Sequence, residues 1–84
     1  MIVDRRVFQE VCKLMVIDED GNQVRSKNCD VKSYSLSVDN QNKLTLKITQ
    51  GNGKIQSYSG VVSAFSDATC SVFKVDNCSY VICD

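Results

Sequence analysis

The segment from Ser33 to Thr49 alternates apolar and polar residues on both sides of a polar centre. A period of two is that of a β-strand, in which successive side chains point to opposite faces. One register keeps every apolar residue on the same face, and it sets Val38 opposite Leu44, Leu36 opposite Leu46, and Tyr34 opposite Ile48. Because a slip by one residue would turn the apolar side chains outward, the sequence specifies this hairpin register well.

The loop and the second face of this hairpin are polar. Asn40-Gln41-Asn42 suits a three-residue turn, because Asn tolerates the left-handed backbone conformation. The second face carries only hydroxyl and ammonium groups, from Ser33, Ser35, Ser37, Thr45, Lys47 and Thr49. We expect this face to lie toward water, as one side of an antiparallel sheet commonly does. Such a surface could also recognise a partner.

Residues 4–13 predict a helix. Val7, Val11 and Leu14 recur at helical spacing, and a second row of apolar side chains lies beside them. Asp4 is suited to cap the first turn, because its carboxylate can accept a free backbone N–H. We therefore expect a helix from about Asp4 to Lys13, followed by a strand at Val16–Ile17. One long strand is the alternative.

Two further turns lie near glycines. Asp20-Gly21 favours a type I′ hairpin with Ile17 opposite Val24. A type II′ turn at Gly51-Asn52 pairs Ile48 with Ile55 and turns Tyr58 outward. A type I′ turn at Asn52-Gly53 would instead set Gln50 opposite Ile55. We prefer the first arrangement, because it keeps Ile55 on the apolar face.

The C-terminal third predicts one more hairpin around Asp76-Asn77. Its expected cross-strand pairs are Val75 with Cys78, Phe73 with Tyr80, Val72 with Val81, and Cys70 with Cys83. Residues 61–68 fit either a short helix or a strand bent at Gly60. Both faces of the last hairpin carry apolar groups, so we expect it to lie centrally in the sheet or to be covered on both sides.

These patterns together predict an α+β fold. The expected architecture is an antiparallel sheet of five or six strands built from hairpins, with one N-terminal α-helix packed on one face. The 84 residues contain no proline, repeat or linker, so we expect one small domain over residues 1–84.

The composition argues against most enzyme chemistry. The chain has no histidine, which excludes Ser-His-Asp and Cys-His catalysis and every histidine-containing zinc site within it. The Asp18–Asn22 loop lacks the glycine and glutamate of an EF-hand, and the segment 51–54 lacks the spacing of a phosphate-binding loop. We therefore expect no enzymatic activity, no cofactor and no metal.

Five cysteines leave one without an intrachain partner in an oxidising compartment. Cys70 and Cys83 would lie opposite each other in the last hairpin, close enough for a disulfide. No signal peptide or long apolar stretch is recognisable, and the favoured expectation is a cytoplasmic protein with reduced thiols. The alternative is a secreted protein, to which the glycosylation acceptor pattern Asn77-Cys78-Ser79 adds little.

Charge is balanced overall but not along the chain. Ten basic and ten acidic residues cancel, whereas residues 24–58 hold six basic and two acidic side chains. A candidate binding surface follows from this basic segment, with Lys43, Lys47, Lys54 and the outward-facing Tyr58. Such a surface favours an acidic partner and accelerates encounter with it.

The remaining expectation is a non-enzymatic protein-binding module that acts through its sheet, on another protein or on a second copy of itself. In general character, though not in sequence, it resembles small phage or viral accessory proteins that inhibit a host enzyme. A secreted cysteine-containing effector is one alternative. A single-stranded nucleic-acid-binding domain is another, but few aromatic residues are free to stack on bases. Nothing in the sequence suggests a membrane partner.

Overall fold

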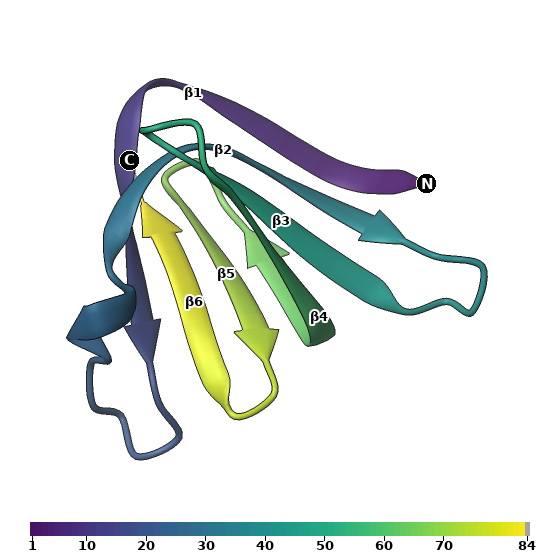
Figure 1. Ribbon diagram of the computed structural model, residues 1–84. Coiled ribbons are helices and arrows are strands. Elements are labelled where there is room, and N and C mark those ends of the chain that lie inside the picture. Colours follow the sequence, from purple (N-terminus) through teal and green to yellow (C-terminus); the bar gives the residue numbers. More distant parts are fainter. Residues whose placement is uncertain (84) are drawn as a thin grey trace.

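The computed structural model describes residues 1–83 and shows a closed antiparallel barrel. Its six strands follow one another around the barrel in chain order, and β1 closes it by pairing with both β2 and β6 (Figure 1). The strands are β1 (Ile2–Ile17), β2 (Cys29–Val38), β3 (Leu44–Gln50), β4 (Ile55–Ser66), β5 (Cys70–Val75) and β6 (Cys78–Cys83). A single 3₁₀ turn, η1 (Arg25–Lys27), precedes β2. The expected α+β class is therefore wrong, and the described chain is almost entirely β-structure.

The predicted N-terminal helix is the main error. Residues 2–17 form one strand of 16 residues, which the sequence offered only as the alternative. Val7 and Val11 are 62% and 55% exposed, whereas Leu14 is 1% exposed, so the three residues do not share a face. Their helical spacing is coincidental. The true period of β1 is two, but it is not visible as an alternation of polar and apolar residues, because Asp4 and Arg6 occupy inward positions in the first half of the strand.

Those inward charges lie at one end of the barrel, where polar partners meet them. Tyr34 donates its hydroxyl to Asp4 Oδ2 at 3.1 Å, and it lies 2.9 Å from Ser71 Oγ. Arg6 donates from Nη2 to the carbonyl oxygen of Asp67 at 3.0 Å. Because each inward polar group has a partner, β1 can point Asp4 and Arg6 inward without leaving them unpaired.

Two hairpins have the predicted registers. The pairs Val38–Leu44, Leu36–Leu46 and Tyr34–Ile48 join β2 to β3, as the alternation requires. In the last hairpin the four expected pairs also occur, including Phe73 with Tyr80 and Cys70 with Cys83. Both registers are confirmed, since each depends on neighbouring segments whose apolar residues must share a face.

Two other turns differ from prediction. Thr49, and not Ile48, pairs with Ile55, because Gln50 and Lys54 close the turn around Gly51–Gly53. Gly53 adopts a φ of 89°, which a three-residue turn of this kind needs. At the earlier turn, Ile17 is bridged to Gln23 and not to Val24.

The strands bend so that the barrel consists of two sheets packed face to face. The first sheet contains the start of β1, most of β2, β3, and residues 55–59 of β4. The second contains residues 61–66 of β4, β5, β6 and residues 13–17 of β1. β4 turns the corner at Gly60, where φ is 80°, and β1 turns it where its register with β2 shifts between Val7 and Cys12.

The core lies between the two sheets. Leu46, Ile48 and Phe73 are at most 1% exposed. Aromatic rings meet across the core, with Tyr34 and Phe73 at 4.9 Å between ring centroids. Since the inner faces of the sheets pack on each other, their outer faces point in opposite directions. In residues 1–83 the structure has no helix able to cross a bilayer.

Candidate functional site

The outer face of the first sheet forms a regular array of hydroxyl groups. Three cross-strand rows of four residues run over β1, β2, β3 and β4. They are Val7–Ser33–Thr49–Ile55, then Arg5–Ser35–Lys47–Ser57, then Ile2–Ser37–Thr45–Ser59. Neighbouring residues in a row are about 5 Å apart, and adjacent rows are about 7 Å apart. We call this array the hydroxyl face.

Positive charge occupies the centre of the hydroxyl face. Arg5 and Lys47 both pair with Ser35 and flank it in the middle row. Together with Ser33 and Thr49 they line a hollow of about 220 Å³. The three rows contain no Asp or Glu, so no carboxylate within the array neutralises the two cations. Two long cationic side chains about 10 Å apart can converge on one anionic group or hold two neighbouring ones.

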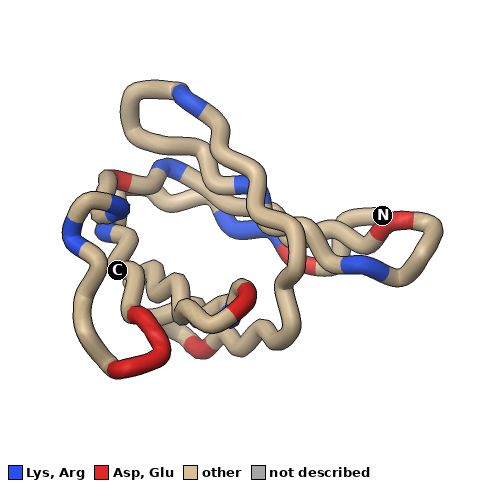
Figure 2. Tube along the Cα trace, turned by 60° about the horizontal axis from the view of Figure 1, so that its bottom comes forward, with Lys and Arg blue, Asp and Glu red and all other residues tan. Residues whose placement is uncertain are grey.

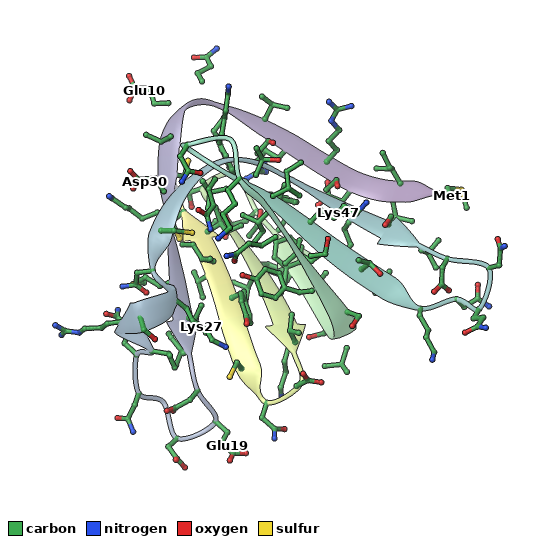
Figure 3. All side chains as sticks on the ribbon, in the orientation of Figure 1. Met1, Glu10, Glu19, Lys27, Asp30 and Lys47 are labelled. Atoms are coloured by element: carbon green, nitrogen blue, oxygen red, sulfur yellow. A yellow bond between two sulfur atoms is a disulfide. The ribbon has the colours of Figure 1, made fainter. Side chains whose placement is uncertain are left out.

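The predicted binding residues do not form one cluster. Lys47 is exposed on β3, as expected, and Figure 3 shows it far from Lys27 and Glu19 at the opposite end of the molecule. Lys43 follows the β2–β3 turn and Lys54 ends the β3–β4 turn, at opposite ends of β3. Lys47 therefore lies in the middle row of the hydroxyl face, and Lys43 and Lys54 lie beyond the two ends of β3.

The outward orientation predicted for Tyr58 is wrong. Tyr58 pairs with the fully buried Leu46, and its ring lies 4.7 Å from that of Tyr80, between centroids. Its hydroxyl donates to Gln56. Burial raises the pKa of Tyr58, and the nearby Tyr80 adds to this effect. The cause of the error is the β3–β4 register, because a shift of one residue exchanges the two faces of β4.

Arg5 is the residue that sequence reasoning missed. Arg5 lies within the helix that was predicted for residues 4–13, and a helix would not have aligned it with Ser35. Only the pairing of β1 with β2 brings it into the row of Lys47. In the structure, exposed and inward positions alternate from residue 3 to residue 8. The sequence does not show this period as an alternation of polar and apolar residues, because Asp4 and Arg6 occupy inward positions.

Figure 2 shows how charge is distributed over the described residues. Most Lys and Arg lie along the first sheet, its turns and η1, whereas the turn after β1 and the β5–β6 turn are acidic, and Lys13 and Lys74 lie on the second sheet. The hydroxyl face is therefore the basic side of a chain whose formal net charge is zero.

The second sheet has a different outer face. One cross-strand row is apolar throughout and contains Phe65, Val72, Val81 and Met15. Phe65 is 65% exposed and Met15 is 37% exposed. We call these four residues the apolar row. The β5–β6 hairpin was expected to lie centrally in the sheet or to be covered on both sides. It lies between β4 and β1, and within residues 1–83 nothing covers its outer side.

A disulfide between Cys70 and Cys83 lies beside the apolar row. It joins two directly opposed residues of β5 and β6, at the pair that the hairpin register places together. Cys29 and Cys78 are half-buried free thiols, and Cys12 is buried and donates its thiol to the carbonyl oxygen of Glu10. Burial, with the nearby Asp30 carboxylate, raises the pKa of the Cys29 thiol, which keeps it protonated at neutral pH.

The residues described contain no group of three or more Cys, Asp or Glu that could hold a metal ion. Closure of the barrel leaves little open sheet edge within residues 1–83. Within residues 1–83 only parts of strands lack a neighbour, chiefly the start of β1, because β6 pairs with residues 13–17 alone. Comparison with protein families, curated proteins and solved structures finds no match to this chain.

Proposed function

We propose that this barrel is a non-enzymatic protein-binding module whose hydroxyl face binds an acidic surface of a protein partner. The observation that carries the proposal is the middle row, where Arg5 and Lys47 flank Ser35 with no carboxylate in the surrounding rows. Such an arrangement attracts carboxylates at long range, and the hydroxyl groups offer hydrogen bonds once contact is made.

The position of Tyr58 favours a protein partner over single-stranded nucleic acid. Proteins that bind single strands stack bases on aromatic rings that lie beside the basic groove. In the described chain the rows of the hydroxyl face contain no aromatic residue, and Tyr58 packs inward on Tyr80. The exposed ring of Phe65 belongs to the opposite sheet.

The disulfide bears on where the module acts. A Cys70–Cys83 bond persists in an oxidising compartment, so it supports a secreted effector over a cytoplasmic protein. Inhibition of a host enzyme, as by small phage or viral proteins, is a further proposal for what partner binding achieves. A catalytic partner would be recognised by loss of its activity when the barrel is added.

The test is affinity capture from cell extract and from culture medium, with and without nuclease. We expect the wild-type barrel to retain an acidic protein that survives nuclease treatment. The double variant Arg5→Glu, Lys47→Glu should lose at least about 90% of it, because reversal of two charges replaces attraction by repulsion. Both side chains are exposed, so the variant is expected to fold.

The control is Lys74→Glu, an exposed lysine on the outer face of the second sheet, and it is compared with the single variant Lys47→Glu, which changes the net charge by the same amount. Lys74→Glu changes the net charge in the same direction as the test variants. Because Lys74 lies outside the hydroxyl face, the variant should leave capture unchanged if that face is the site. Equal loss with Lys74→Glu would show that overall charge, and not this face, governs binding. Loss of every partner on nuclease treatment would favour the nucleic-acid alternative.

A further inference from the structure

The apolar row crosses all four strands of the second sheet. Phe65, Val72, Val81 and Met15 come from four adjacent strands and follow one another across them. Isolated apolar side chains on a surface are normal, but a continuous set with polar residues around it marks an interaction site.

The residues beside the apolar row carry charges of both signs. On one side the row of the disulfide ends in Asp67 on the β4 side and Lys13 on the β1 side. On the other side are Ser63, Lys74, Ser79 and Ile17. A surface with both signs can face a copy of itself, whereas the hydroxyl face would set Arg5 and Lys47 against like charges.

We propose that a second copy of this chain covers the apolar row in a two-fold symmetric dimer, with the axis parallel to the strands. Rotation about such an axis reverses the order of the strands. It therefore sets Phe65 on Met15 of the second copy and Val72 on Val81 of the second copy. The aromatic ring and the thioether form a favourable pair, and the β-branched side chains fill the centre.

Charge complementarity selects this axis. The same rotation brings Lys13 toward Asp67 of the second copy, and it sets Lys74 over Ser79 of the second copy. Lys13 also pairs with Asp30 of its own chain, so the contact would extend an existing ion pair. An axis perpendicular to the strands would set Phe65 on Phe65 and leave Lys13 over Ile17.

The dimer would present two hydroxyl faces. Since the outer faces of the two sheets point in opposite directions, pairing through the second sheet leaves both first sheets free. The dimer could therefore bind one acidic partner on each of its two outer sides. The self-association itself does not depend on the function proposed for the hydroxyl face.

Light scattering over a range of concentrations tests the proposal. We expect the wild-type mass to rise from 9.3 kDa toward twice that value, and Phe65→Asp to raise the dimer dissociation constant about 30-fold or more. Phe65 is largely exposed, so the variant should fold, and circular dichroism checks this. Lys47→Glu is the control and should dimerise as the wild type does. A wild type that stays at 9.3 kDa up to millimolar concentration would overturn the proposal.

A cross-linking experiment tests the axis. Phe65→Cys and Met15→Cys are made in separate chains, mixed and oxidised. We expect a covalent dimer that contains one chain of each variant, above the background that the free thiols give in the wild type. Cross-linking of Phe65→Cys to itself, with no mixed dimer, would contradict the proposed axis.

Discussion

The Tyr34 hydroxyl connects the buried Ser71 of the second sheet to the Asp4 carboxylate near the start of β1. Its hydroxyl lies 2.9 Å from Ser71 Oγ, and Ser71 is fully buried. In Tyr34→Phe the buried Ser71 hydroxyl loses the acceptor of its hydrogen, and the Asp4 carboxylate loses one donor. We expect a loss of about 1–2 kcal/mol in the free energy of unfolding, measured by urea denaturation. A change below about 0.5 kcal/mol, typical of surface substitutions, would show that the network does not stabilise the barrel.

Two aspartates at turns make stability depend on pH. The backbone N–H of Lys43 holds the pKa of Asp39 below its usual value of 3.8, and that of Cys70 does the same for Asp67. A carboxylate with a lowered pKa stabilises the fold fully above the pKa of the unfolded chain, and this contribution is lost as pH falls through the lower folded value.

The melting temperature should therefore be insensitive to these two groups above about pH 5 and should fall below about pH 4. In the double variant Asp39→Asn, Asp67→Asn the fall should be shallower, because neither amide titrates. Thermal melts from pH 7 to pH 2 measure the difference. Parallel profiles for the two proteins would show that other carboxylates control the acid transition.

At the scale of single elements, the β5–β6 hairpin is the one that carries a covalent link. Cys70 and Cys83 are separated by 13 residues. A disulfide that closes a loop of this size lowers the conformational entropy of the unfolded chain. It thereby raises the free energy of unfolding by up to about 3 kcal/mol. We expect Cys70→Ala, Cys83→Ala to lose a large part of that stability. Titration of denatured, unreduced protein should find three thiols, and five thiols would mean that the bond does not form.

The sequence predicted the hairpins β2–β3 and β5–β6 because their pairing is local. Alternation over a short loop leaves one register that buries Leu36, Leu46 and Phe73 together. The β3–β4 register was missed by one residue, since several turns fit the glycines at 51 and 53. Because of that single shift, Tyr58 is half-buried against the core and does not point outward.

β1 could not be recognised from local pattern. Its partners lie far along the chain, with Arg5 opposite Ser35 and Met15 opposite Val81. Its inward charges are satisfied only by residues of other strands, such as the Tyr34 hydroxyl. The candidate site could not be predicted for the same reason. Arg5 and Lys47 flank Ser35 only because β1 pairs with β2 and β2 pairs with β3.

At the scale of the whole molecule, closure by β1 creates two outer faces of different chemistry. Because β1 contributes its first half to one sheet and its last residues to the other, Arg5 lies on the hydroxyl face and Met15 on the apolar row. The barrel thus separates a cationic surface, which we propose binds an acidic partner, from an apolar surface, which we propose binds a second copy. On these proposals, different substitutions alter partner binding and self-association.

The most direct test of this account is to map where an acidic chain touches the barrel. Amide chemical shifts of the ¹⁵N-labelled protein are followed as a glutamate-rich peptide of about 20 residues is added at low salt. We predict the largest changes in the row of Arg5, Ser35, Lys47 and Ser57, lost in Arg5→Glu, Lys47→Glu and retained in Lys74→Glu. Changes centred on the apolar row, or spread evenly over all exposed lysines, would contradict the assignment of the hydroxyl face.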